Sequence, residues 1–208
     1  MGIVEILGVA GSLSLLAGWR LYLTLLAAGV AMRFGWLPLP EHLKALQVLA
    51  SPWILGIAAI GTVAEFLADK VAWVDTAWDT VHGLIRPLGG ALLALALVDS
   101  SDPVWQAAAL LLGGGGALLS HGAKAATRTV VNVSPEPYSN AAVSTGEDVA
   151  TSSLLALAIA FPPLAIAIAI LLAVAAVVVI VALRRLLRNI KAGLKRALGD
   201  APPPGSSV

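Results

Sequence analysis

One uninterrupted apolar run constrains the fold more than any other feature of the chain. Residues 164 to 183 read LAIAIAILLAVAAVVVIVAL and contain no charged or polar side chain. Because an α-helix rises about 1.5 Å per residue, roughly 20 apolar residues suffice to cross the hydrocarbon core of a bilayer. Hydrophobic residues make up 59% of the chain and charged residues only 12%, which excludes an ordinary soluble domain. The sequence therefore predicts an all-α, polytopic membrane protein.

The other apolar stretches bring the predicted number of transmembrane helices to six. Prolines, glycines and short polar segments separate these stretches, and proline in particular interrupts a helix. The predicted spans are residues 7–32, 52–71, 75–98, 104–131, 140–161 and 164–183. We therefore expect residues 1–183 to form one transmembrane helical domain.

The orientation follows from the basic residues beside the spans. Six Lys and Arg residues lie within 184–200, directly after the last span, and basic flanks favour the cytoplasm. With six spans, this predicts both termini in the cytoplasm. The segment 184–200 also reads as an amphipathic helix, which either lies along anionic headgroups or serves only as an orientation signal. The tail 201–208, APPPGSSV, is predicted to be disordered.

Charged residues shorten the apolar part of several predicted spans on the same, cytoplasmic side. Lipid penalises each such charge by roughly 2.5–3.5 kcal/mol, so these side chains should face one another or water inside the bundle. In the third span, Asp75, Asp79, His82 and Arg86 recur at the spacing of one helical face. The residues predicted to line a polar, cytoplasm-facing cavity are Arg20, Glu65, Asp69, Asp79, His82, Arg86, His121, Lys124, Arg128, Glu147 and Asp148.

Two interpretations of this cavity remain open at this point. Acids and bases are nearly balanced, so the cluster is either a salt-bridge network that locks the bundle or a solvated site for an ion or polar headgroup. The spacing of Asp75, Asp79 and His82 also fits ligands of one cation, and Glu65 or Asp69 would complete an oxygen-rich shell. A divalent cation is therefore the one cofactor that the sequence raises. The chain has no Cys, which excludes thiolate sites.

A faint internal similarity raises a further hypothesis about the architecture. The segments GSLSLLAGWRLYLT and GGALLSHGAKAATR align without gaps and pair Gly11 with Gly115, Gly18 with Gly122, and Arg20 with Lys124. Two three-helix halves related in this way would be inverted in the membrane, as in many transporters. The sequence therefore raises a 3+3 inverted repeat.

Three strings together resemble a known family. They are ADKVAWVDTAWDTVHGLIRPLGGAL, SHGAKAATRTVVNVSPEPYSN and GEDVATSSLLAL. Over residues 5 to 162 they resemble a bacterial family of small membrane proteins known only as domain of unknown function 4126. The resemblance implies a helical membrane protein of the bacterial inner membrane and brings no established activity.

The leading prediction for function is a transporter or channel for a small ion or polar solute. The first rival is a lipid-headgroup-handling protein or enzyme, in which Arg and Lys side chains would clamp a phosphate. The second is a structural protein whose charges only pair internally. An enzyme is the less favoured reading, because no nucleophile motif is present. The expected partners are membrane lipids and a small ion or polar solute, with a homo-oligomer also considered. The net charge of +1 gives no indication of nucleic-acid binding.

Overall fold

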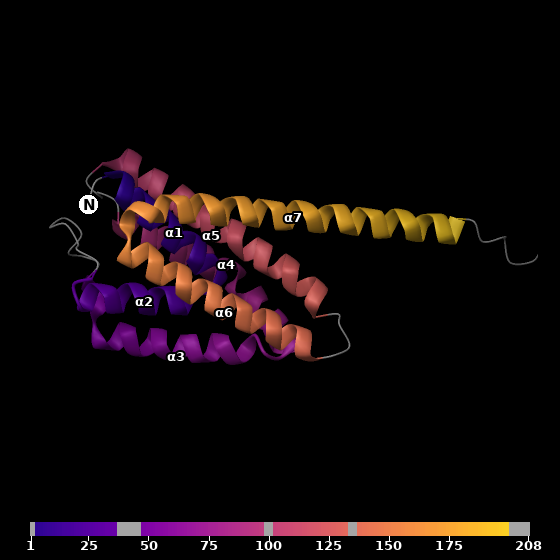
Figure 1. Ribbon diagram of the computed structural model, residues 1–208, viewed down its shortest axis with the longest axis horizontal. Helices are drawn as coiled ribbons and strands as arrows, with labels where there is room; N and C mark the ends of the chain where they lie inside the picture. Colours follow the sequence, from indigo (N-terminus) through magenta and orange to yellow (C-terminus); the bar gives the residue numbers. More distant parts are fainter. Residues whose placement is uncertain (1–2, 37–46, 98–101, 133–136, 200–208) are drawn as a thin grey trace, which may run out of the picture.

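The computed structural model describes residues 3–36, 47–97, 102–132 and 137–199, and these ranges form an all-α fold (Figure 1). The prediction of an all-α protein is thus confirmed. The described chain contains seven α-helices rather than the six expected. They are α1 (Ile3–Trp19), α2 (Leu21–Arg33), α3 (Pro52–Ala68), α4 (Ala72–Leu97), α5 (Pro103–Val131), α6 (Pro137–Ala160) and α7 (Pro162–Gly199).

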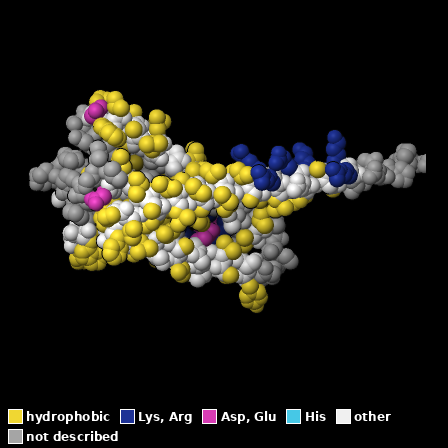
Figure 2. All heavy atoms as spheres, turned by 45° about the horizontal axis from the view of Figure 1, so that its top comes forward, with side chains coloured by type: hydrophobic (Ala, Val, Ile, Leu, Met, Phe, Trp, Pro, Cys, Tyr) yellow, Lys and Arg dark blue, Asp and Glu magenta, His cyan; other side chains and the backbone are white. Residues whose placement is uncertain are grey.

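The lengths and compositions of these helices indicate a multi-pass membrane protein. Three segments, Trp73–Leu97, Pro103–Val131 and Pro162–Arg196, are long and apolar enough to cross a membrane. Three shorter apolar helices, α1, α2 and α3, accompany them. Large apolar side chains cover much of the outer surface, as Figure 2 shows. Such a surface suits lipid rather than water, because soluble monomers rarely expose large contiguous apolar patches.

The first predicted span, residues 7–32, is wrong as a single helix. Arg20 has non-helical backbone angles, φ −137° and ψ 87°, and separates α1 from α2. The chain reverses there, so that Ala31 of α2 shares one apolar cluster with Val9 of α1. A continuous helix would hold the Arg20 guanidinium within the hydrocarbon. The reversal instead places it at the tip of a helical hairpin, beside carboxylates from other helices.

The hairpin adds a reversal that the predicted topology lacks. Successive helices run in alternating directions, and α1 begins at the opposite end of the bundle from the end of α7 (Figure 1). That both termini lie in the cytoplasm stays a prediction. It rests on an even number of passes, whereas the hairpin makes the number of alternating helices in the described chain odd.

Small residues bring α1, α4 and α5 into close contact. A Cβ on Gly18 would lie 2.1 Å from the carbonyl oxygen of Ala117 and 2.2 Å from Oγ of Ser120, both in α5. A Cβ on Gly90 of α4 would lie 2.8 Å from the carbonyl oxygen of Gly113. These glycines therefore have no room for a side chain. Close approach through glycine is a common way for membrane helices to associate without a hydrophobic driving force.

The contacts between α1 and α5 also overturn the inverted repeat. Ser14 approaches Gly113, Leu15 approaches Gly116, and Gly18 approaches Ser120, so the two helices run parallel. Inverted repeats would relate helices that run in opposite directions. Of the aligned glycines, Gly18 lies against α5, whereas Gly11 and Gly122 face α7 and Gly115 has nothing within 4 Å.

Helix α7 is continuous across residue 184, where the sequence predicted a separate cytoplasmic helix to begin. Its buried stripe, Ala165, Ile168, Leu172 and Ala176, packs on the bundle. Beyond the bundle the helix projects on its own, and basic side chains line this part (Figures 1 and 2). The predicted tail 201–208 lies outside the described residues.

Candidate functional site

Charged side chains from helices α3 to α6 and from the α1–α2 hairpin tip meet at one end of the bundle, in what we call the charged centre. They come from the α1–α2 hairpin tip, the end of α3, the first turns and the middle of α4, the last turns of α5 and the middle of α6. All but two of its members are at most 7% exposed, although every one of them is ionisable. The members are Arg20, Glu65, Asp69, Lys70, Asp75, Asp79, Arg86, His121, Lys124, Arg128, Glu147 and Asp148.

Asp69 is the hub of this centre. It forms the C-cap of α3, is fully buried, and its Oδ2 lies 2.8 Å from Nζ of Lys124. The same oxygen contacts the guanidinium of Arg20 and lies 3.4 Å from NH2 of Arg128. One carboxylate thus connects α3, α5 and the tip of the α1–α2 hairpin. A carboxylate with several charge-assisted contacts is strongly held in place.

Arg86 forms a second node, in the middle of α4. Its NH2 donates to Oε1 of Glu65 at 2.8 Å, and its NH1 donates to Oδ1 of Asp79 at 2.7 Å. The same NH1 lies 2.7 Å from Nδ1 of His121. Since a guanidinium only donates, Nδ1 of His121 must accept, and this geometry requires the neutral imidazole.

The third node joins α5 and α6. Arg128 donates to Oε2 of Glu147 at 2.6 Å and to Oδ1 of Asn140 at 2.5 Å. Nearby, NH2 of Arg20 lies 2.8 Å from Oδ1 of Asp148, whose other oxygen lies 3.2 Å from Nζ of Lys70. The two acidic residues of α6 therefore contact basic residues from both halves of the chain, and all these charges form one connected network.

Some polar residues of this region were not among the sequence-predicted ones. Lys70 also donates to Oγ of Ser144 at 2.6 Å, and Asn140 contacts both Arg128 and the carbonyl oxygen of Asp69. The spacing of residues in the sequence could have indicated two of these, Asn140 and Ser144. Asn140, Ser144 and Glu147 recur at i, i+4 and i+7, which places them on one face of α6.

His82 lies apart from the aspartates with which the sequence grouped it. Its Nδ1 contacts the carbonyl oxygen of Trp78 at 2.8 Å, and its Nε2 contacts the hydroxyl of Tyr22 at 3.1 Å. Both ring nitrogens thus have partners on α4 and α2. The predicted metal set of Asp75, Asp79 and His82 is therefore not assembled, because a histidine uses one free ring nitrogen to bind a metal.

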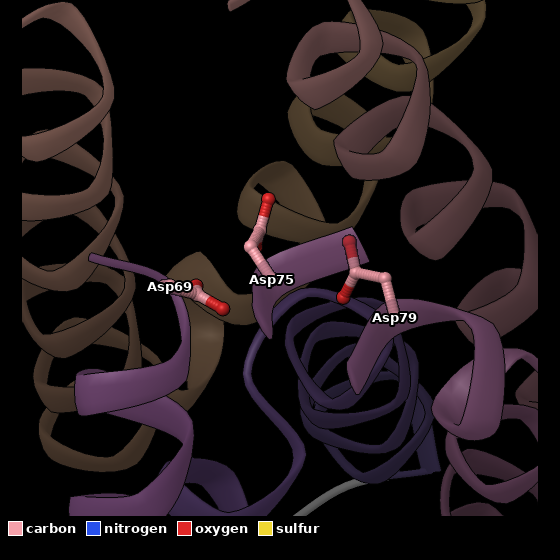
Figure 3. Close-up of side chains that lie close together, drawn as sticks. All are labelled: Asp69, Asp75 and Asp79. Carbon is pink, nitrogen blue, oxygen red and sulfur yellow. The ribbon is translucent and has the colours of Figure 1, made fainter. Parts of the chain in front are cut away.

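Asp69 takes the place predicted for His82. In the described residues, Asp69, Asp75 and Asp79 each offer a carboxylate oxygen, and these three oxygens lie within 4.8 Å of one another (Figure 3). All three residues are buried. Asp69 Oδ1, Asp75 Oδ1 and Asp79 Oδ2 have no hydrogen-bond partner among the described residues. Buried carboxylate oxygens rarely remain without a hydrogen-bond partner, so this set is the strongest candidate for binding a cation.

A small cavity opens onto the charged centre from the side of the bundle. Its volume is about 170 Å³, well below the roughly 300–1,000 Å³ typical of sites for drug-sized ligands, and it suits only an ion or small solute. Figure 2 shows acidic side-chain atoms within one gap among the apolar side chains of the bundle. The cavity is lined by Arg20, Leu23, Thr62, Glu65, Phe66, Asp148 and Ser152.

Comparison with known proteins gives one result. Residues 7–182 match a family model described as Domain of unknown function (DUF4126). No curated protein and no solved structure matches the chain. The match covers most of the chain and includes every residue of the charged centre. The chain therefore belongs to the DUF4126 family.

Proposed function

We propose that this protein transports a small ion or polar solute through its charged centre. The observation that carries the proposal is the side cavity of about 170 Å³, because it brings solvent-accessible space to Arg20, Glu65 and Asp148. These residues belong to a network whose other members are nearly all buried. Ionisable groups at membrane depth are rare and generally mark pathways or relays, unless they only pair with one another.

The structure supports the rival phosphate-clamp function less well. Each arginine of the charged centre already contacts carboxylates: Arg20 with Asp148, Arg86 with Glu65, and Arg128 with Glu147. A phosphate would have to displace these carboxylates and would be repelled by them. A transport assay distinguishes this proposal from a purely structural role for the network, in which no flux would be seen.

The test is a flux assay with the full chain reconstituted into liposomes. Radioactive sodium, radioactive rubidium, radioactive phosphate and a pH-sensitive dye cover small cations, an anion and protons. We expect uptake of at least one of these above that of protein-free liposomes, and a large decrease in Asp148→Asn, because Asp148 lines the cavity.

Asp102→Asn is the matched control. It also removes one carboxylate, but Asp102 lies outside the charged centre and serves as the N-cap of α5, where its side chain accepts from the backbone N–H of Val104. Asparagine caps helices about as well as aspartate, so this variant should keep full flux. No flux of any probe by the folded wild-type protein would overturn the transport proposal.

A further inference from the structure

The charged centre contains one more acid than base. Its six carboxylates belong to Glu65, Asp69, Asp75, Asp79, Glu147 and Asp148. Its five cationic side chains belong to Arg20, Lys70, Arg86, Lys124 and Arg128. His121 adds no charge, because its Nδ1 accepts from Arg86. The centre therefore carries one uncompensated negative charge, which is expensive to keep buried.

The uncompensated charge belongs to Asp75. Every other carboxylate of the centre has a cationic nitrogen within 2.8 Å. The closest cationic atom to Asp75 is Nε of Arg128, at 4.0 Å, and its hydrogen bond at 2.8 Å comes from the neutral amide of Asn132. Asp75 is nevertheless fully buried.

The atoms needed to bind a cation lie around Asp75. Its Oδ1, Oδ1 of Asp69 and Oδ2 of Asp79 are buried and have no hydrogen-bond partner in the described chain. The cations that hold Asp69 and Asp79 contact the other oxygen of each carboxylate, Asp69 Oδ2 and Asp79 Oδ1. One oxygen of each therefore remains available, and each of the three carboxylates offers an oxygen within 4.8 Å of the other two (Figure 3). Carboxylate oxygens are preferred ligands of hard cations.

We propose that Asp69, Asp75 and Asp79 bind one monovalent alkali cation, and that this cation completes the charge balance of the centre. The class of ion follows from the charge count: one positive charge is missing, and a divalent ion would add an excess beside Lys124 and Arg128. A proton on Asp75 would supply the same charge, but its single O–H donates one hydrogen bond and would satisfy at most one of the other two oxygens. The inference rests on the proposed function and names the substrate class of that site.

The experiment is equilibrium binding of radioactive sodium and radioactive rubidium to the full chain purified in detergent, with choline chloride holding the ionic strength constant. We expect saturable binding of one ion per chain. Asp75→Asn should weaken this binding by about tenfold or more, since it removes the uncompensated charge. Asp102→Asn is again the matched control and should bind like the wild type.

A second measurement keeps the proposal open to refutation if Asp75→Asn folds poorly. The bound alkali cation should raise the melting temperature of the wild type, because a ligand that binds only the folded state stabilises it. In choline alone, Asp75→Asn should melt no lower than the wild type, because it removes a buried charge without a close partner.

Three results would overturn the proposal: no saturable binding of either ion by the wild type, unchanged affinity in folded Asp75→Asn, or displacement of the bound ion by calcium at lower concentration than by potassium.

Failure of this inference and failure of the proposed function are distinguishable. Binding without flux would contradict transport alone. Flux of protons or phosphate without alkali binding would contradict the cation site alone.

Discussion

Replacing Asp69 by Asn should severely destabilise the folded protein. Asp69 contacts three cations through one buried oxygen. Arg20 and Arg128 keep other carboxylates, but Lys124 retains only Asp79, at 3.6 Å. Leaving a buried charge without its partner typically costs about 3–5 kcal/mol. For a chain of this size, each kcal/mol lowers the melting temperature by about 2–4 °C, so the expected decrease is about 6–20 °C.

The assay is thermal unfolding of the detergent-solubilised chain, followed by circular dichroism. Asp102→Asn, which removes a carboxylate that caps α5, serves as the control and should melt close to the wild type. The double variant Asp69→Asn, Lys124→Met removes the orphaned ammonium and should recover much of the lost stability, since losing both members of a buried pair is often nearly neutral. A melting temperature of Asp69→Asn within about 2 °C of the wild type, less than 1 kcal/mol, would refute the reasoning.

Three further predictions use the same melting measurement. Gly18→Ala should lower the free energy of unfolding by about 1–3 kcal/mol, because a Cβ there overlaps the α5 backbone, whereas Gly115→Ala, with nothing within 4 Å, should not destabilise the fold. Tyr22→Phe removes the hydroxyl partner of His82 and should lower stability by about 0.5–1.5 kcal/mol; no loss would show that the contact contributes nothing. Deletion of the chain from residue 184 onward should leave the melting temperature of the bundle unchanged, because residues 184–196 are all exposed; a clear decrease would reveal a contact that the structure lacks.

The gathering of charges at one end of the bundle could be predicted from the sequence. Lipid penalises an exposed charge whatever its neighbours are, so a charged residue in an apolar helix indicates a buried polar partner. This argument placed Arg20, Glu65 and Lys124 in one cluster, and the structure brings them into one network. It could not say which acid meets which base, because helical spacing does not fix the rotation of one helix against another.

The reversal at Arg20 could not be predicted from local sequence signals. The surrounding residues, LLAGWRLYLT, contain no proline, and the one glycine stands two residues earlier. The break arises from tertiary contacts, because Arg20 reaches carboxylates of α3 and α6 only at the tip of a hairpin. The surroundings of His82 could not be predicted for a similar reason, because its partner Tyr22 comes from another helix.

The way α3 is attached has a mechanical consequence. Helix α3 packs mainly against α2. Most of its large apolar side chains, such as Trp53 and Ile60, are exposed on the outer surface. The glycine-packed helices α1, α4 and α5 leave no space for sliding. The links from α3 to α4 and α5 are largely ionic, through Glu65 and Asp69. A change of charge in the centre would therefore loosen α3 while the glycine-packed helices stay in place.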